Sequence, residues 1–213
     1  MARTKSKKLA KVGLFPNVFQ FTGDSVEGKL KEYFGNDKNI SLEIGCGHGD
    51  FSINLAQVFS NRNFLGVDTK GARVWMGAKE ALDLKLKNVA FLITRAENLA
   101  KIFTSLRIEE IYLPFPDPHL RRRSAKNRLV SALFLDIYKT ILVKGGKIHL
   151  KTDNEALYKY AISNIEKKGM TVYYITDNLY SSEGMEAIKS IRTSYEEHYL
   201  SEGRVIKYLC FGS

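Results

Sequence analysis

Residues 42–51 read LEIGCGHGDF, an apolar run that leads into three glycines at alternating positions. The apolar residues before the first glycine predict a buried strand, and those after the last glycine, at helical spacing, predict a helix. Gly45, Gly47 and Gly49 are therefore expected at a strand-to-helix turn, where glycine allows positive φ angles and close approach of the backbone to a ligand. This turn predicts an α/β fold with a ligand site at the end of its first strand.

The alternation of strand and helix continues along the chain. Strands are predicted at 40–45, 63–68, 88–95, 109–115, 147–153, 170–177 and 204–211, and helices at 48–60, 72–86, 97–106, 127–142 and 155–168. Gly145 and Gly146 are expected to end the helix over 127–142. Strict alternation with right-handed crossovers predicts a doubly wound, mostly parallel sheet with helices on both faces. Ligands of such folds bind beyond the carboxyl ends of the strands.

Acidic side chains accompany the glycine turn. The dinucleotide-binding pattern requires glycine at position 50, where this chain has Asp50. A carboxylate at Glu43 would repel a pyrophosphate and attract a cation, and Asp68 at the next strand end can accept hydrogen bonds from ribose hydroxyls. These features favour S-adenosylmethionine, which carries positive charge and no phosphate. A dinucleotide, or a tight turn without a ligand, is the alternative.

A second conspicuous stretch, YLPFPDPHLRRRSAKNRL, covers residues 112–129. Two prolines flank Asp117 and are expected to hold Phe115 and Asp117 in extended geometry. Stiff loops at strand ends commonly carry catalytic residues, although aspartate beside proline is also ordinary turn chemistry. The cationic residues that follow, Arg121, Arg122, Arg123, Lys126 and Arg128, form either a solvated face or a phosphate-binding surface.

Composition agrees with a polyanionic partner. The chain has 213 residues, a formal net charge of +10 and a sequence pI near 9.5. Two cysteines form no disulfide framework, and no metal motif, secretory signal or membrane-spanning run is recognised, so we expect a cytoplasmic protein. Residues 1–35 are interpreted as a basic arm, containing Lys5, Lys7, Lys8 and Lys11, with a lead-in, and residues 36–213 as one domain.

In sequence order, LEIGCGHG, GVD, YLPFPDPHLRRRSAKNRL, IHLKTDN and TSYEEHYLSEG resemble the bacterial tRNA (guanine-N7)-methyltransferase family. The resemblance runs from about residue 40 to the end. It implies a class I, Rossmann-like methyltransferase domain with a seven-stranded sheet whose last strand is antiparallel. It also implies methyl transfer from S-adenosylmethionine to N7 of the variable-loop guanine in tRNA, by a monomer or homodimer without a metal.

The resemblance assigns roles to particular residues. It implies that Asp117 is catalytic. Cofactor contacts are implied at Glu43, Asp68 and Asp117. The residues themselves suggest further cofactor contacts at Gly45, Gly47 and Gly49 in the glycine turn and at Arg95 or Glu97 beside the adenine. Substrate contacts are implied at Arg121, Asp153, Thr193, Ser194, Tyr195 and Glu196, and the cationic cluster suggests phosphate contacts at Arg122, Arg123 and Lys126. Three positions depart from the family pattern: His119 stands where Trp is common, Arg95 where Asp or Asn is usual, and Ser194 where Lys is frequent.

The proposed chemistry suits these residues. Guanine N7 has a lone pair and no proton, so its attack on a sulfonium methyl group needs no strong base. Positive charge then develops on the purine, where a fixed carboxylate at Asp117 would stabilise it. Asp153 or Glu196 could accept hydrogen bonds from the N1–H and N2 amine of guanine. A methyltransferase for another RNA, or a non-catalytic RNA-binding module with this fold, remains an alternative.

Overall fold

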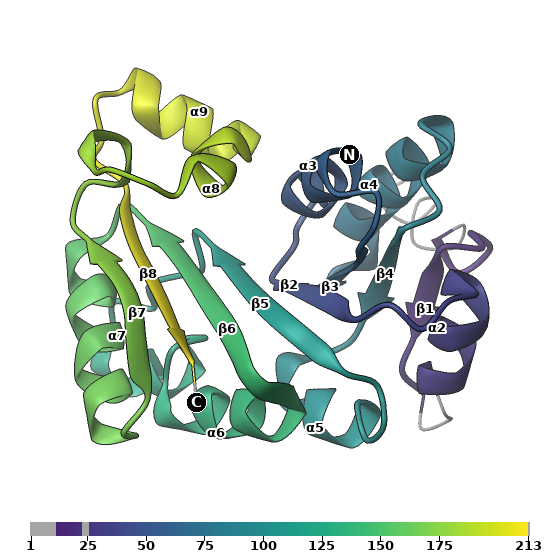
Figure 1. The fold of residues 1–213 in the computed structure, drawn as a ribbon, viewed down its shortest axis with the longest axis horizontal. Helices are drawn as coiled ribbons and strands as arrows, with labels where there is room; N and C mark the ends of the chain where they lie inside the picture. The colour runs from purple at the N-terminus through teal and green to yellow at the C-terminus, as the bar shows by residue number, and fades with distance from the viewer. Residues whose placement is uncertain (1–11, 23–25, 213) are drawn as a thin grey trace. The chain divides into compact units, whose positions relative to one another are not determined.

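The computed structural model describes residues 12–22 and 26–212, so the basic residues expected in the N-terminal arm lie outside the described part. The chain forms two compact units, which meet in sequence between Ile108 and Glu109. Each unit carries four strands of a mixed sheet, and Figure 1 shows their strands and helices. The α/β class predicted from the glycine turn is confirmed.

The first unit is built on parallel strands. Its elements are β1 (Val18–Gln20), α2 (Val26–Phe34), β2 (Ile40–Ile44), α3 (Asp50–Val58), β3 (Asn63–Asp68), α4 (Gly71–Asp83), β4 (Val89–Ile93), the 3-10 turn η1 (Ala96–Asn98) and α5 (Leu99–Ile102). The strands lie in the order β1-β4-β3-β2, and every pair is parallel. Strands β2, β3 and β4 are almost completely buried, as their continuous apolar runs predict.

The second unit contains the antiparallel strand. Its elements are β5 (Ile108–Pro114), the 3-10 segment η2 (Arg122–Asn127), α6 (Ala132–Ile141), β6 (Leu142–Thr152), α7 (Glu155–Lys167), β7 (Thr171–Thr176), the 3-10 turn η3 (Leu179–Ser181), α8 (Glu186–Ser190), α9 (Ser194–Ser201) and β8 (Lys207–Gly212). The order is β5-β6-β8-β7, with β8 antiparallel to both neighbours. In Figure 1, α8 and α9 lie beyond the carboxyl ends of β6 and β7.

Helices α2, α8 and α9 were not predicted from the sequence, and three further details differ from the prediction. An additional strand, β1, pairs with β4 and makes eight strands where seven were expected. The helix expected over 127–142 is shorter, because η2 precedes it and β6 begins at Leu142. Gly145 and Gly146 lie inside β6 and do not end the helix.

Close backbone packing explains Gly146 inside β6, whereas Gly145 has a φ angle of +76° and a Cβ atom there would meet nothing within 4 Å. A Cβ atom on Gly146 would lie 2.9 Å from the Val143 carbonyl oxygen and 3.0 Å from the Glu109 carbonyl oxygen. Gly146 also lies close to Gly212 of β8, where a Cβ atom would lie 2.3 Å from the Gly146 carbonyl oxygen. Glycine here therefore permits close approach of backbones in the sheet. Because glycine is also favoured where helices end, the sequence alone did not distinguish the two.

Both cysteines are buried, one in each unit. Cys46 lies in the glycine turn after β2, and Cys210 lies in β8 within a core cluster with Leu179, Ile206 and Tyr208. Burial raises the pKa of both thiols above the ordinary range. The thiols are therefore protonated packing groups near neutral pH.

Candidate active site

The glycine turn in the first unit requires its glycines. The amides of Gly45 and Cys46 both donate to the Val67 carbonyl oxygen, at 2.8 and 3.0 Å, which fixes the start of the turn against β3. Gly45, Gly47 and Gly49 have φ angles of 81°, 56° and 84°. A Cβ atom on Gly49 would lie 2.5 Å from Cε1 of Phe91, whereas one on Gly47 would meet nothing within 4 Å. The turn is thus packed at Gly49 and open at Gly47.

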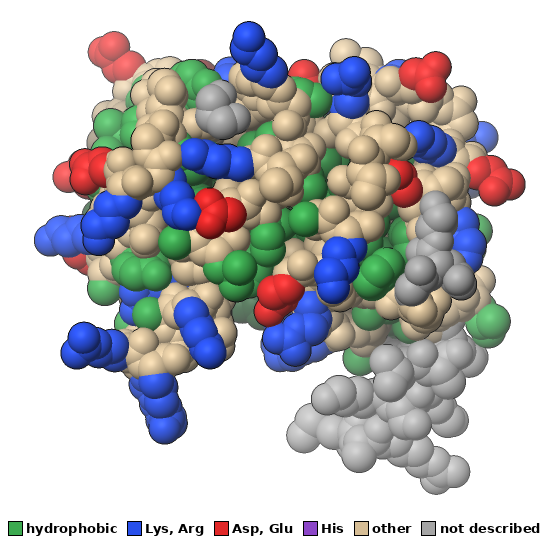
Figure 2. Space-filling model, turned by 90° about the horizontal axis from the view of Figure 1, so that it is seen from below, with side chains coloured by type: hydrophobic (Ala, Val, Ile, Leu, Met, Phe, Trp, Pro, Cys, Tyr) green, Lys and Arg blue, Asp and Glu red, His purple; other side chains and the backbone are tan. Residues whose placement is uncertain are grey.

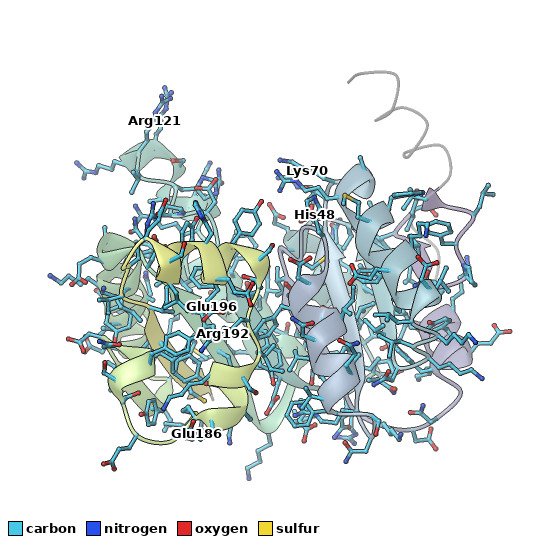
Figure 3. All side chains as sticks on the ribbon, turned by 90° about the horizontal axis from the view of Figure 1, so that it is seen from above. His48, Lys70, Arg121, Glu186, Arg192 and Glu196 are labelled. Atoms are coloured by element: carbon cyan, nitrogen blue, oxygen red, sulfur yellow. The ribbon has the colours of Figure 1, made fainter. Side chains whose placement is uncertain are left out.

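Asp68, at the end of β3, holds this turn from the neighbouring strand. Its Oδ2 accepts a hydrogen bond from the Gly47 amide at 2.9 Å, and its Oδ1 accepts one from the Lys70 amide at 2.8 Å. Figure 3 shows His48 and Lys70 at the same end of the first unit. The structure therefore brings together two elements that the sequence predicted to cooperate, the glycine turn and the acid of the following strand.

Glu43 lies below the turn and is buried. Its Oε2 accepts hydrogen bonds from the Ser52 amide at 2.9 Å and from the Ser52 hydroxyl at 2.5 Å. Burial raises the pKa of Glu43 to about 8, so the carboxyl group keeps its proton near neutral pH. The expected attraction of a cation by a Glu43 carboxylate is therefore not supported. The side chain ties the first turn of α3 to β2.

Glu97 lies in η1, after β4. Its carboxylate accepts a hydrogen bond from Arg95 at 3.0 Å, and this bond lowers the pKa of Glu97. Arg95, which stands where the family usually has Asp or Asn, therefore pairs with Glu97, the acid that was expected to contact the cofactor. The pair is largely exposed.

In the second unit, the loop after β5 presents Asp117. The Phe115 amide donates to the Lys151 carbonyl oxygen of β6 at 2.8 Å, and the Asp117 side chain is 72% exposed. Its Oδ1 accepts a hydrogen bond from the His119 amide at 2.9 Å. The loop therefore presents a carboxylate that is oriented by the backbone and open to solvent.

The backbone of this loop differs from the prediction. Phe115 was expected to be extended because a proline follows it, but its φ angle is +50°. Tertiary contacts override the local preference, because the Phe115 amide bonds to β6 and its ring packs edge-on to Tyr199 at 5.6 Å between centroids. His119 also has a positive φ angle, +41°. Both positions are unusual for residues with a side chain.

The cationic segment follows this loop. Arg121, Arg122, Arg123 and Lys126 are exposed, on or beside η2, whereas Arg128 is partly buried. Figure 3 shows Arg121 on a segment that projects away from Glu196 and Arg192 of the same unit. In Figure 2, Lys and Arg side chains gather on a projecting part of the surface and also occur elsewhere on that face. The four exposed cations can reach a polyanion.

Glu196 is placed differently from the expectation that it contacts substrate. Its side chain is 0% exposed, and its two carboxylate oxygens accept hydrogen bonds from Nζ of Lys151 at 2.9 and 3.0 Å. The Tyr180 hydroxyl also donates to Glu196 Oε1, at 2.7 Å, and Lys151 donates to the Ile191 carbonyl oxygen at 2.8 Å. This buried ion pair joins β6 to α9.

The other residues of the late motif divide between the interior and the surface. Thr193 is buried and caps α9, since its Oγ1 accepts a hydrogen bond from the Glu196 amide at 3.1 Å. Ser194 and Tyr195 are exposed in the first turn of α9. The motif is therefore partly a helix start with a buried acid, and partly a surface.

Asp153 follows β6 directly. Its Oδ2 accepts a hydrogen bond from Nη1 of Arg204 at 2.8 Å, and the Arg204 guanidinium lies 4.4 Å from the centroid of the Tyr199 ring. Sequence reasoning missed Arg204 and Lys151 as partners of the predicted acids. For Lys151 the sequence does offer a signal, because a lysine inside an apolar strand suggests a buried ion pair. Arg204 has no comparable signal.

Two kinds of site are not found within the described residues. Residues 12–22 and 26–212 contain no cluster of three or more His, Cys, Asp or Glu side chains that could hold a metal ion. Among the helices in this part of the chain, none combines the length and the apolar character needed to cross a bilayer.

Comparison with known proteins identifies clear relatives. A family model described as "Putative methyltransferase" matches residues 37–209. A tRNA (guanine-N(7)-)-methyltransferase of Bacteroides fragilis (strain YCH46) is 40% identical over 219 residues, which cover 99% of this chain and 86% of the relative. The protein of the same name from Porphyromonas gingivalis (strain ATCC BAA-308 / W83) is 42% identical over 209 residues, covering 93% and 85%.

Solved structures show the same fold at lower identity. An antibiotic-related methyltransferase superposes with a TM-score of 0.66 at 18% identity, over 91% of this chain and 96% of that chain. At this identity the likeness concerns the fold alone.

Proposed function

The chain belongs to the tRNA (guanine-N7)-methyltransferase family, and we propose that it transfers a methyl group from S-adenosylmethionine to N7 of the variable-loop guanine in tRNA. The observation that carries this proposal is the identity of 40% and 42% to two enzymes of that name, over 99% and 93% of the chain. We also propose that it acts in the cytoplasm, as a monomer or homodimer.

The first unit has the features that S-adenosylmethionine requires. The backbone at Gly47 faces open space, and the Asp68 carboxylate lies beside it and retains lone pairs for ribose hydroxyls. A dinucleotide is disfavoured because Asp50 stands where the dinucleotide-binding turn requires its third glycine. Bound S-adenosylmethionine would supply an electrophilic methyl group on a positively charged sulfur. We assign its binding to Gly45, Gly47, Gly49, Asp68 and Glu97 of the first unit, and we assign a supporting role to Glu43, whose buried side chain bonds to Ser52.

Asp117 is assigned the catalytic role. Methylation at N7 places positive charge on the guanine ring, and a carboxylate held in position stabilises that charge without removing a proton. The hydrogen bond from the His119 amide orients the Asp117 carboxylate before any substrate binds. The exposed cations Arg121, Arg122, Arg123 and Lys126 would bind phosphates of the tRNA and so align the base with Asp117.

Recognition of guanine is assigned to Asp153. The Glu196 carboxylate is buried and bonded to Lys151 and Tyr180, whereas Asp153 is partly exposed. Burial therefore favours Asp153 over Glu196 as the acceptor for the guanine N1–H and N2 amine. Four residues of the late motif are assigned to substrate binding in the second unit: Thr193, Ser194, Tyr195 and Glu196. Ser194 and Tyr195 are exposed and can contact the tRNA, whereas the buried Thr193 and Glu196 hold the start of α9 in place.

The test uses labelled S-adenosylmethionine and unmodified tRNA transcripts, followed by chemical cleavage at 7-methylguanine. Cleavage in the variable loop is expected. The matched control is a transcript with 7-deazaguanine, which lacks the N7 atom and should stay unlabelled. Label without cleavage at the variable loop would indicate a methyltransferase with another target. Cofactor binding without label would indicate a non-catalytic RNA-binding module.

A further inference from the structure

Arg128 differs from the other cations of its segment in its contacts. Its Nε donates to the Pro118 carbonyl oxygen at 2.8 Å, and its Nη2 donates to the His119 carbonyl oxygen at 3.2 Å. Its guanidinium carbon lies 4.3 Å from the centroid of the Tyr160 ring, on α7. Two donors and one face of the guanidinium are thus engaged by the protein. Arg121, Arg122, Arg123 and Lys126, in contrast, are exposed.

These contacts act on the backbone that carries Asp117. Pro118 and His119 are the two residues directly after Asp117, and His119 has a φ angle of +41°. A non-glycine residue in this region costs on the order of 1 kcal/mol or more, so surrounding contacts must hold it there. The planar guanidinium binds both carbonyl oxygens at once, which fixes their relative orientation.

The position of Tyr160 makes the arrangement rigid. An arginine that stacks on an aromatic ring loses rotational freedom before it binds its acceptors. Because Tyr160 lies on α7, a 13-residue helix, the guanidinium is anchored to a regular element of the second unit and not to another loop. The Arg128 side chain therefore links the loop that carries Asp117 to α7.

We propose that Arg128 is a positioning residue for Asp117 and is not part of the phosphate-binding surface. The proposal rests on the proposed function in one respect, which is that Asp117 takes part in methyl transfer. Arg128 orients the Pro118–His119 carbonyls, and through them the His119 amide that donates to Asp117. Lysine cannot replace it, because an ammonium group is a point donor without a planar fork.

The two possible roles of Arg128 predict different kinetics. If Arg128 bound a phosphate, the lysine charge in Arg128→Lys would largely preserve that interaction. If Arg128 positions the loop, lysine does not preserve its function, and kcat falls while tRNA affinity and its salt dependence stay unchanged. We expect kcat of Arg128→Lys to fall about 10- to 100-fold, the range that misplacement of a reacting group produces.

Matched variants separate the effects. Tyr160→Leu removes the stacking ring and should lower kcat as Arg128→Lys does. Tyr160→Phe keeps the ring and loses only the long hydrogen bond of 3.5 Å from the Tyr160 hydroxyl to the Ala125 carbonyl oxygen, so it should retain most of kcat. Arg122→Gln should weaken tRNA binding and reduce its salt dependence. Arg128→Lys with wild-type kcat but weaker, less salt-dependent tRNA binding would overturn the proposal.

A second measurement does not depend on activity. The exchange rate of the His119 amide reports its hydrogen bond to Asp117. We expect Arg128→Lys and Tyr160→Leu to accelerate this exchange, with amides in the middle of α7 unchanged. Unchanged His119 exchange in both variants would overturn the positioning role. Faster exchange in a protein whose wild type methylates no tRNA would leave the positioning role standing and reject the proposed function.

Discussion

Asp117 carries the proposed chemistry at the scale of one residue. Asp117→Asn keeps the size of the side chain and an oxygen that can accept from the His119 amide, but removes the negative charge. We expect kcat for 7-methylguanine formation to fall about 100-fold or more, because charge stabilisation in the transition state is lost. Binding of S-adenosylmethionine and tRNA should change little by comparison. Turnover at the wild-type rate would refute the electrostatic role.

Glu43 gives a pH-dependent prediction at the same scale. Its pKa is raised from an ordinary value near 4.5 to about 8, so between these values the folded protein holds a proton that the unfolded chain has released. This contribution to stability is full below pH 4.5, is lost as pH rises toward 8, and is constant above. Glu43→Gln carries no ionisable group and should escape the loss.

The prediction for Glu43→Gln is therefore a difference between two pH values. The variant should match the wild type at pH 5 and exceed its free energy of unfolding by about 4 kcal/mol at pH 8.5, measured by urea denaturation. Glu32→Gln, in the same unit, serves as the control and should show no such trend. Equal stability at both pH values would mean that Glu43 is ionised throughout.

At the scale of elements, the pair Lys151–Glu196 fastens α9 to β6. Removal of one partner leaves the other charge buried, which typically costs about 3–5 kcal/mol. Lys151→Met and Glu196→Gln should therefore each lower the free energy of unfolding strongly, while the double variant should lose much less than the sum. A double-mutant cycle by denaturation measures this coupling. Additive losses would show that the two groups stabilise independently.

The elements also show what sequence reasoning could and could not provide. Strands with continuous apolar runs, such as β2 and β3, were predicted nearly to the residue, because burial on both faces leaves a strong signal. The environment of Glu196 could not be predicted, because its partner Lys151 lies 45 residues away and the two meet only in the folded unit. The extended conformation predicted for Phe115 was wrong for a related reason, since a hydrogen bond to β6 overrides the local effect of proline.

At the scale of the whole molecule, the net charge of +10 should make tRNA binding strongly dependent on salt. Each phosphate contact adds about 0.7 to 0.9 to the slope of log affinity against log salt concentration. Simultaneous replacement of Arg121, Arg122, Arg123 and Lys126 by Gln should therefore lower this slope by about 3, measured by filter binding. An unchanged slope would place the tRNA on other cations.

Because each unit buries one cysteine, the reactivity of the two thiols reports how often each unit opens. A maleimide reagent modifies only a thiolate that solvent can reach, so labelling of Cys46 requires the first unit to open and labelling of Cys210 requires the second. With Cys46→Ser and Cys210→Ser variants, labelling rates would give two separate opening free energies from one polypeptide. A ligand held by one unit would slow labelling there first, so the same two thiols can reveal which half of the chain each substrate stabilises.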